Sequence, residues 1–190
     1  MTEVCMIMAI GPDNVIGKGN KLAWHSKMDF IHFVRKTKGC PCIFGATTFY
    51  GLPKYPLTNR LNIVLNIERD KTELCHNENG CWIETNNITT ALEDICKSYE
   101  KVFICGGKSI YEYCLNNNLI DTIYLTEIYT KDGSLEDEID EHPNDFIRFP
   151  IDIKEYVKDW YKLPIVYTGY NISENCQCLF TKFSKEKPKE

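Results

Sequence analysis

A lone carboxylate lies in an apolar stretch near the N-terminus. In LAWHSKMDFIHF, which runs from Leu22 to Phe33, the one acidic residue is Asp29. Its bulky apolar neighbours along the chain are Trp24, Met28, Phe30, Ile31 and Phe33. A lone acid in an apolar cleft has a raised pKa, which suits it to hold a proton near neutral pH. However, Ser26-Lys27-Met28-Asp29 also fits S-x-x-D/E, a pattern typical of a capped helix N-terminus where the acid does no chemistry. Both interpretations are open from this stretch alone.

Two turns that follow strand-like runs could bind phosphate. In VFICGGKSIYEYCL (102–115) a β-rich run meets Gly106-Gly107 before a helical pattern begins, and CIFG leads in the same way into Ala46-Thr47-Thr48. The free amides and the dipole of a helix N-terminus favour phosphate, and glycine lets the backbone approach it closely. Neither turn matches G-x-G-x-x-G, so the pair indicates a dinucleotide site that is not of the Rossmann type. Glycine that only bends the chain is the alternative.

A glycine-rich connection and an arginine complete the candidate binding elements. GPDNVIGKGNKLAW (11–24) has glycines at 11, 17 and 19 and joins the first strand-like run to the Asp29 segment. It has the composition of a mobile lid, or of an ordinary loop. Arg60 follows YPLTN at the entrance to a strand-like run, where its planar fork could clamp a carboxylate or simply lie on the surface.

Strand-like and helix-like patterns alternate along the chain. Apolar runs predict strands at 4–10, 40–45, 61–66, 81–85, 101–106 and 122–129, and helical spacing predicts helices at 26–36, 47–52, 89–97 and 109–116. This alternation predicts an α/β fold with a mostly parallel central sheet flanked by helices, as a single domain over residues 1–184. WYKLPIVYTGYN (160–171) and CQCLFTKF (176–183) predict a C-terminal antiparallel hairpin, followed by a charged tail at 185–190.

Composition indicates a soluble globular protein. Hydrophobic residues make up 43% and charged residues 26% of 190 residues, and the net charge of −5 argues against a nucleic-acid face. No apolar run approaches the roughly 20 residues that span a bilayer. The start, MTEVCMIMAIG, lacks a basic leader and therefore predicts a strand and no signal peptide. Ten cysteines without a C-x-x-C pair predict free thiols in a reducing compartment and no metal site.

The segment Lys131–Asp145, KDGSLEDEIDEHPND, differs from the rest of the chain in being acidic and poor in core residues. It predicts a solvated surface loop. A metal site that uses Glu127, His142 and neighbouring acids is the alternative that the sequence leaves open.

The order and spacing of these features resemble the dihydrofolate reductase family from about Val4 to Tyr129, and more loosely beyond. The motifs that carry the resemblance are Ala9-Ile10 with Val15-Ile16-Gly17, Leu22-x-Trp24 followed by Asp29, Phe33-x-x-x-Thr37, Pro41-x-Ile43-x-Gly45-x-x-Thr48-Phe49, Pro56-Leu57-x-x-Arg60-x-Asn62, Gly106-Gly107-x-x-x-Tyr111 and Tyr124-Leu125-Thr126. No single motif is diagnostic, but their succession is specific.

The resemblance implies reduction of 7,8-dihydrofolate to 5,6,7,8-tetrahydrofolate by hydride transfer from NADPH, in support of one-carbon metabolism and thymidylate synthesis. Asp29 would pair with the pterin N3 and 2-amino group, Thr126 would hydrogen-bond that carboxylate, and Trp24 would help to hold a water. The implied substrate-binding residues are Ile7, Met8, Asp29, Phe33, Leu57, Arg60 and Cys105. The implied cofactor-binding residues are Ala9, Ile16, Gly17, Gly45, Thr47, Thr48, Asn66, Arg69, Gly106, Gly107, Lys108, Ser109, Ile110 and Tyr111. The resemblance also implies antifolate-type ligands, no nucleic-acid or membrane partner, and a monomer in the cytoplasm.

The chain departs from the family pattern at several positions. Ala23 stands where proline is usual beside the tryptophan, and Ala46 stands where a basic residue often meets the 2′-phosphate of the cofactor. Glu68 adds a negative charge near the same strand end. We therefore expect NADPH to be preferred over NADH, but by a narrower margin than a full cluster of basic residues would give. A related pyrimidine or pterin reductase, and a non-catalytic NADPH- or folate-binding protein, are the alternative functions.

Overall fold

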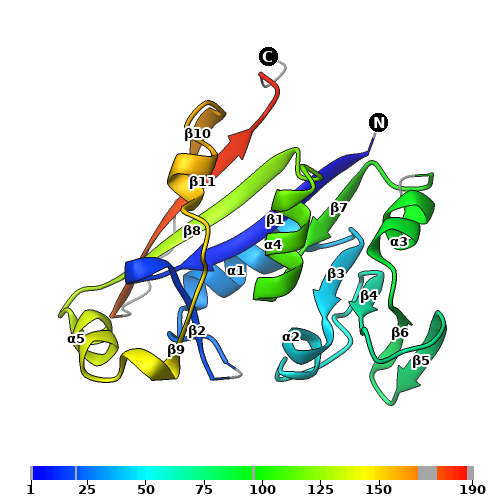
Figure 1. The fold of residues 1–190 in the computed structure, drawn as a ribbon, viewed down its shortest axis with the longest axis horizontal. Helices are drawn as coiled ribbons and strands as arrows, with labels where there is room; N and C mark the ends of the chain where they lie inside the picture. Colours follow the sequence, from blue (N-terminus) through cyan, green and yellow to red (C-terminus); the bar gives the residue numbers. More distant parts are fainter. Residues whose placement is uncertain (1, 20, 96, 167–174, 188–190) are drawn as a thin grey trace. The chain divides into compact units, whose positions relative to one another are not determined.

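The computed structural model describes residues 2–19, 21–95, 97–166 and 175–187, and Figure 1 shows the course of the chain. The chain divides into two compact units that alternate in sequence. The first unit comprises Met1–Ile7 and Arg35–Ile120, and the second comprises Met8–Val34 and Asp121–Glu190. Strand β1 (Glu3–Ile10) and helix α1 (Lys27–Thr37) each begin in one unit and end in the other. The expected single domain over residues 1–184 stays a prediction.

The first unit is built on a mostly parallel sheet. The start of β1 pairs with β7 (Lys101–Ile104), which is followed across the sheet by β3 (Cys42–Gly45), β4 (Asn62–Leu65) and β6 (Gly80–Thr85), all parallel. Strand β5 (Glu73–Asn77) is antiparallel to β6 (Figure 1). The inner strands are buried along nearly their whole length, as is typical of parallel strands with both faces covered.

Short helices connect these strands. They are α2 (Ala46–Tyr50), α3 (Ile88–Ile95) and α4 (Lys108–Asn116). Every strand and helix predicted up to residue 130 is confirmed, with bounds that differ by at most two residues. The fully buried ring of Phe49 packs on Phe44, Tyr55 and Trp82, with ring centroids 5.2–5.8 Å apart. This aromatic cluster fixes α2 beside β3 and β6.

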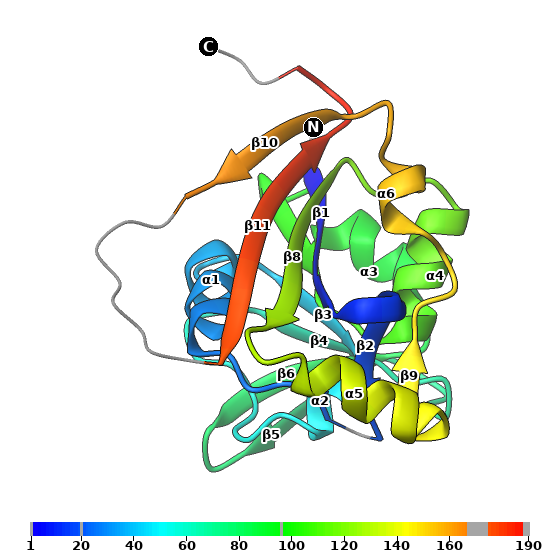
Figure 2. The ribbon, with the colours of Figure 1, turned by 90° about the vertical axis from the view of Figure 1, so that its left-hand side faces the viewer.

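The second unit contains an antiparallel sheet. Strand β8 (Thr122–Thr130) pairs with β11 (Cys176–Ser184), which pairs with β10 (Tyr161–Ile165) (Figure 2). The C-terminal hairpin is thus confirmed, although residues 167–171 of its expected first strand lie outside the described residues. The α/β fold with a mostly parallel central sheet and this late hairpin is confirmed.

The acidic segment of the second unit is not the surface loop that its composition predicts. It forms helix α5 (Ser134–Glu141) and the short 3-10 helix η2 (Pro143–Asp145), and leads into strand β9 (Phe146–Arg148). Asp137, Asp140 and Glu141 of α5 are exposed, whereas Leu135 and Ile139 are buried. Strand β9 pairs with β2 (Val15–Lys18), which follows the 3-10 helix η1 (Pro12–Asn14) within the glycine-rich connection. Beyond β9, helix α6 (Ile153–Tyr156) precedes the hairpin.

Candidate active site

Asp29 is the third residue of α1 and lies in its first turn. The backbone N–H of Asp29 donates to Ser26 Oγ over 3.2 Å, and the N–H of Phe30 donates to the Ser26 carbonyl over 3.1 Å. Ser26 therefore caps the helix with its own side chain. The cap needs only the backbone of Asp29, which leaves the carboxyl group for chemistry.

The environment of the Asp29 carboxyl group favours its protonated form. Burial raises the pKa of Asp29, and the nearby Thr126 hydroxyl lowers it by a smaller amount. That hydroxyl is close enough to favour the charged form but does not reach a well-aligned hydrogen bond with any described residue. Thr126 itself is 1% exposed on β8. The sequence-based expectation of a desolvated acid beside Thr126 agrees with this geometry.

Two buried polar atoms of the expected site in the second unit have no hydrogen-bond partner among the described residues. They are Nε1 of Trp24 and Oγ1 of Thr126. A buried donor or acceptor without a partner is destabilising, so such atoms are usually matched by a water or a ligand. Both belong to residues that the sequence assigns to catalysis. The site is thus ready to make polar contacts that the described chain does not itself supply.

The glycine-rich connection, here called the lid (residues 11–24, all described except residue 20), packs against α5. Val15 belongs to a buried cluster with Ile128, Leu135, Ile139 and Phe146, against which Ala9, Ala23 and Trp24 also pack. At Gly11 a Cβ would lie 3.2 Å from the Trp24 ring and 3.4 Å from Leu135, so a larger residue would push the two apart. The acidic segment therefore buttresses the ring of Trp24.

Polar contacts hold the outer part of the lid. Lys18 Nζ lies 2.5 Å from Glu138 Oε1 of α5 and 5.2 Å from the centre of the Phe146 ring. The Gly19 N–H donates to the Asp145 carbonyl over 3.2 Å, and the Phe149 N–H donates to the Asn14 carbonyl over 2.8 Å. Ile16 and Gly17 lie on β2, between these contacts.

In the first unit, the two predicted phosphate-binding turns lie together. The Gly45 N–H donates to the Gly106 carbonyl over 2.7 Å, and a Cβ on Gly107 would lie 2.7 Å from Thr48 Oγ1. Gly106 has a φ of +106°, which side chains rarely allow, and the Gly106-Gly107 peptide is cis. Thr47, Lys108 and Ser109 at the two helix starts are exposed. Close packing of glycine backbone beside the free amides of α4 is a cradle that suits phosphate.

Strand β1 and helix α4 are joined by one side chain. Tyr111 Oη donates to the Ile7 carbonyl over 2.6 Å, which leaves that oxygen one further lone pair. Ile110, the other buried residue of this turn, lies 3.3 Å from a Cβ placed on Gly45. Cys105, whose thiol pKa is raised far above normal by burial, directly follows β7. Its N–H donates to the Ile43 carbonyl over 2.8 Å.

Arg60 is held by two neighbouring residues, Thr37 and Thr58, for which the sequence predicted no role. Its Nε donates to Thr37 Oγ1 over 3.0 Å and its Nη1 to the Thr58 carbonyl over 2.9 Å. Asn62, 1% exposed, accepts from the Leu57 N–H over 3.0 Å and donates to the Leu57 and Arg60 carbonyls. Asn62 and Thr37 thus fix the loop that carries Leu57 and the guanidinium. Both residues belong to the motifs that carry the family resemblance, but the sequence did not predict these hydrogen bonds.

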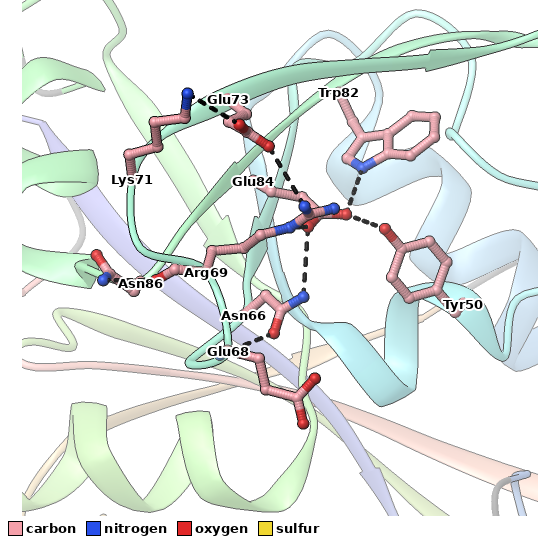
Figure 3. A network of polar contacts seen from close by, with 9 residues as sticks. All are labelled: Tyr50, Asn66, Glu68, Arg69, Lys71, Glu73, Trp82, Glu84 and Asn86. Carbon is pink, nitrogen blue, oxygen red and sulfur yellow. Dashed lines mark hydrogen bonds and ion pairs between the residues drawn. The ribbon is translucent and has the colours of Figure 1, made fainter.

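Asn66 and Arg69, assigned to the adenosine end of the cofactor, both donate to Glu84 (Figure 3). Arg69 Nε lies 2.5 Å from Glu84 Oε2, and Asn66 Nδ2 lies 3.3 Å from the same oxygen. Glu68 points away from this oxygen in Figure 3, while its N–H donates to Asn66 Oδ1 over 3.1 Å. No sequence pattern pointed to Glu84, because it stands in a run typical of an ordinary strand.

The remaining predicted residues belong to the second unit. Met8 is buried and Ala9 half-buried at the end of β1, and Phe33 is half-buried on α1. Each unit therefore gathers its own part of the expected site, with Asp29, Trp24 and Thr126 in the second unit and the glycine turns, Arg60 and Arg69 in the first.

Glu127 of β8, a candidate metal ligand, contacts Tyr129 and Lys154. It accepts from Tyr129 Oη over 3.0 Å and pairs with Lys154 Nζ at 2.5 Å. His142, exposed at the end of α5, does not share a cluster of three potential ligands with it among the residues described. Glu127 also lines a pocket of about 300 Å³ together with residues 10–14 and Lys154. None of the predicted site residues lines this pocket.

Comparison with known proteins gives a consistent family. The family model for dihydrofolate reductase matches residues 3–142. The dihydrofolate reductase of Haemophilus influenzae is 31% identical over 126 residues, covering 66% of this chain and 72% of that protein. That of Neisseria meningitidis serogroup A is 34% identical over 128 residues, covering 67% and 74%. A solved dihydrofolate reductase from Enterococcus faecalis, complexed with NADP(H) and RAB-propyl, superposes with a TM-score of 0.66 at 23% identity over 96% of this chain and 95% of that one. The fold, the site geometry and these matches agree, and the chain belongs to the dihydrofolate reductase family.

Proposed function

We propose that this protein reduces 7,8-dihydrofolate to 5,6,7,8-tetrahydrofolate with NADPH. The observation that carries the proposal is Asp29, a carboxyl group whose pKa is raised by burial and whose helix is capped without it. Protonation at the pterin N5 needs a proton donor, and a raised pKa keeps the Asp29 carboxyl group protonated to higher pH. Membership of the family supports the same reaction.

Asp29 would bind the pterin through its N3 and 2-amino group. Both are donors, and a carboxylate accepts two parallel hydrogen bonds with good geometry. The Thr126 hydroxyl would complete this arrangement by hydrogen-bonding the carboxylate. Trp24 would hold a water through Nε1, because that buried donor has no partner among the described residues. Trp24 is also the residue that α5 supports, so the lid and the proton donor would act together.

The glycine cradle of the first unit fits a dinucleotide. Gly45, Gly106 and Gly107 bring backbone amides close together, and Thr48 Oγ1 lies where any side chain on Gly107 would stand. Bound NADPH supplies the hydride. The chain's own part is to hold the phosphates with the α4 amides, Thr47, Thr48, Lys108 and Ser109, and the adenosine end with Asn66 and Arg69. Ala9, Ile16 and Gly17 would contact the nicotinamide.

Arg60 would bind the glutamate end of the substrate. Its Nε and Nη1 are held by Thr37 and Thr58, and Asn62 fixes the loop beneath it. Such fixing lowers the entropy lost when a carboxylate binds. Phe33 and Leu57 would flank the benzoyl ring, and Ile7, Met8 and Cys105 would border the pterin. Antifolate-type inhibitors would contact the same residues. We expect a monomer in the cytoplasm without nucleic-acid or membrane partners. Among the described helices, none combines the length and the hydrophobicity that a membrane span requires.

One assay separates the proposed function from its alternatives. Loss of absorbance at the NADPH band is followed with dihydrofolate, with a dihydropterin that lacks the benzoylglutamate tail, and with NADH in place of NADPH. We expect turnover with dihydrofolate and NADPH, and slower turnover in the other combinations. Turnover confined to the tail-less pterin or to a pyrimidine would favour a related reductase. Tight NADPH binding, measured by quenching of tryptophan fluorescence, without any turnover would favour a non-catalytic binding protein.

A further inference from the structure

Glu84 is a buried carboxylate that the proposed reaction does not use. Its side chain has no exposed surface. Four side chains donate to it, as Figure 3 shows: Tyr50 and Trp82 to Oε1, and Asn66 and Arg69 to Oε2. Burying a carboxylate costs several kcal/mol unless it is paired and hydrogen-bonded, and an apolar residue at the same place is often as stabilising. The fold alone therefore does not explain Glu84.

The position of Glu84 relates it to the predicted cofactor site. It is the penultimate residue of β6, and it lies opposite Val64 of the parallel neighbour β4. Asn66 and Arg69 follow the end of β4, in a turn closed by the Arg69 N–H donating to the Asn66 carbonyl over 3.1 Å. In parallel sheets the carboxyl ends of the strands form the ligand-binding edge. Glu84 thus reaches from inside the fold to the two residues assigned to the adenosine end.

Glu84 restrains Arg69 more firmly than any other contact of that side chain. The Nε–Oε2 distance is 2.5 Å, whereas the second acid, Glu73, lies 3.3 Å from Nη1 and is itself shared with Lys71 at 3.4 Å. The Arg69 side chain remains 41% exposed, so the guanidinium is both held and accessible. A free arginine loses much rotamer freedom on binding, and a pre-oriented one loses less.

We infer that Glu84 is a positioning residue for the cofactor, which acts by holding Arg69 in the orientation that meets the adenosine end of NADPH. This inference rests on the proposed function, which assigns Arg69 to that end. Asn66 is braced by the same oxygen and keeps the turn in place. Arg69 also presents less net positive charge to NADPH, because its neighbours are acidic, namely Glu68, Asp70, Glu73 and Glu84.

The test compares Glu84→Gln with Glu73→Gln, which removes the other acid at Arg69. Dissociation constants for NADPH and NADH are measured by fluorescence quenching, and kcat is measured at saturating cofactor. We expect Glu84→Gln to raise the dissociation constant for NADPH roughly fivefold to tenfold, because members of one hydrogen-bond network are strongly coupled. The value of kcat should be nearly unchanged. Glu73→Gln should shift the NADPH constant less than about twofold, since exposed ion pairs contribute little. Tighter NADPH binding by Glu84→Gln, or lower thermal stability with both constants unchanged, overturns the inference.

Two further variants keep the test decisive if Glu84→Gln does not fold. Arg69→Lys keeps the positive charge but lacks the Nε donor that Glu84 holds, so it should bind NADPH nearly as weakly as Arg69→Ala. If Arg69→Lys binds like the wild type, charge alone suffices and Glu84 does not position it. Where Glu84→Gln folds, it should add less than about twofold in the Arg69→Ala background. A wild-type protein that does not oxidise NADPH with dihydrofolate refutes the proposed function. A wild type that does so, with Arg69→Ala and Glu84→Gln both binding NADPH normally, refutes the inference alone.

Discussion

Replacing Asp29 by asparagine should remove activity and raise stability at the same time. The variant keeps the shape of the side chain and the backbone N–H that donates to Ser26 Oγ, so α1 should begin as before. It loses the carboxyl group that is proposed to bind the pterin and supply the proton. A positioned proton donor contributes about 10²–10⁴-fold to the rate, which is about 3–5 kcal/mol of activation free energy. We expect a loss of that size in kcat/KM at pH 7, with partial recovery at low pH, where the substrate is already protonated.

The stability gain follows from the direction of the pKa shift. Burial raises the pKa of Asp29 in the folded state above its unfolded value. The folded protein therefore loses stability as the pH rises from the unfolded pKa, about 4, through the folded pKa, by about 1.4 kcal/mol for each unit between them. Asparagine carries no charge to desolvate. The variant should thus unfold at higher denaturant concentration than the wild type at pH 7, and this advantage should disappear near pH 4.

The matched control is Ser26→Ala, which removes the capping oxygen and keeps the carboxyl group. It should lose about 1 kcal/mol of unfolding free energy while keeping most of its turnover. Urea unfolding at pH 4 and pH 7 and absorbance kinetics of both variants complete the test. An Asp29→Asn variant that turns over dihydrofolate like the wild type at pH 7, or that is destabilised like Ser26→Ala, would show that Asp29 is only a helix cap.

Three other substitutions test the rest of the site. Arg60→Leu should weaken the binding of dihydrofolate by about 2–3 kcal/mol, as expected for a lost charge-assisted hydrogen bond, and weaken the binding of a tail-less dihydropterin far less. Equal losses in the two dissociation constants would mean that Arg60 only supports the fold. Leu135→Ala should lower the unfolding free energy by about 3 kcal/mol, because it leaves a cavity in a buried cluster, and should reduce kcat because Trp24 packs on that cluster. Asp140→Ala, on the exposed face of α5, should change neither quantity in the same urea and kinetic measurements. Arg69→Ala should narrow the preference for NADPH over NADH by up to about tenfold, or about 1.4 kcal/mol; Michaelis constants that shift alike for both cofactors would show that Arg69 does not read the phosphate.

The parts of the fold that local pattern determines could be predicted from the sequence. Continuous apolar runs such as that of β7 are recognisable because both faces of a parallel strand are buried. The helix start at Ser26 and the strand–helix turns at Gly45 and Gly106 follow from local chemistry, and the structure has them where they were expected. The role of Asp29 could be predicted only from the family resemblance, because a helix-capping acid and an active-site acid both fit the pattern at Ser26–Asp29.

What the sequence could not predict depends on distant partners. The acids of residues 131–145 outnumber its apolar residues, so the burial of Leu135 and Ile139 is visible only once Val15 and Phe146 are placed against them. Strand β2 has only four residues and owes its conformation to its pairing with β9. Glu84 stands in a strand-like run and gains its four donors from three separate segments of the first unit. Spacing along the chain carries no record of such contacts.

The support of the lid by α5 determines how temperature and salt should affect it. The ion pair between Lys18 and Glu138 is 37% and 43% exposed, so added salt screens it and its contribution is small. Most of the support comes from the apolar contacts of Leu135 and Ile139 with Val15. Apolar contacts resist salt but weaken on cooling. The lid of this protein should therefore loosen as the temperature falls and remain nearly indifferent to ionic strength.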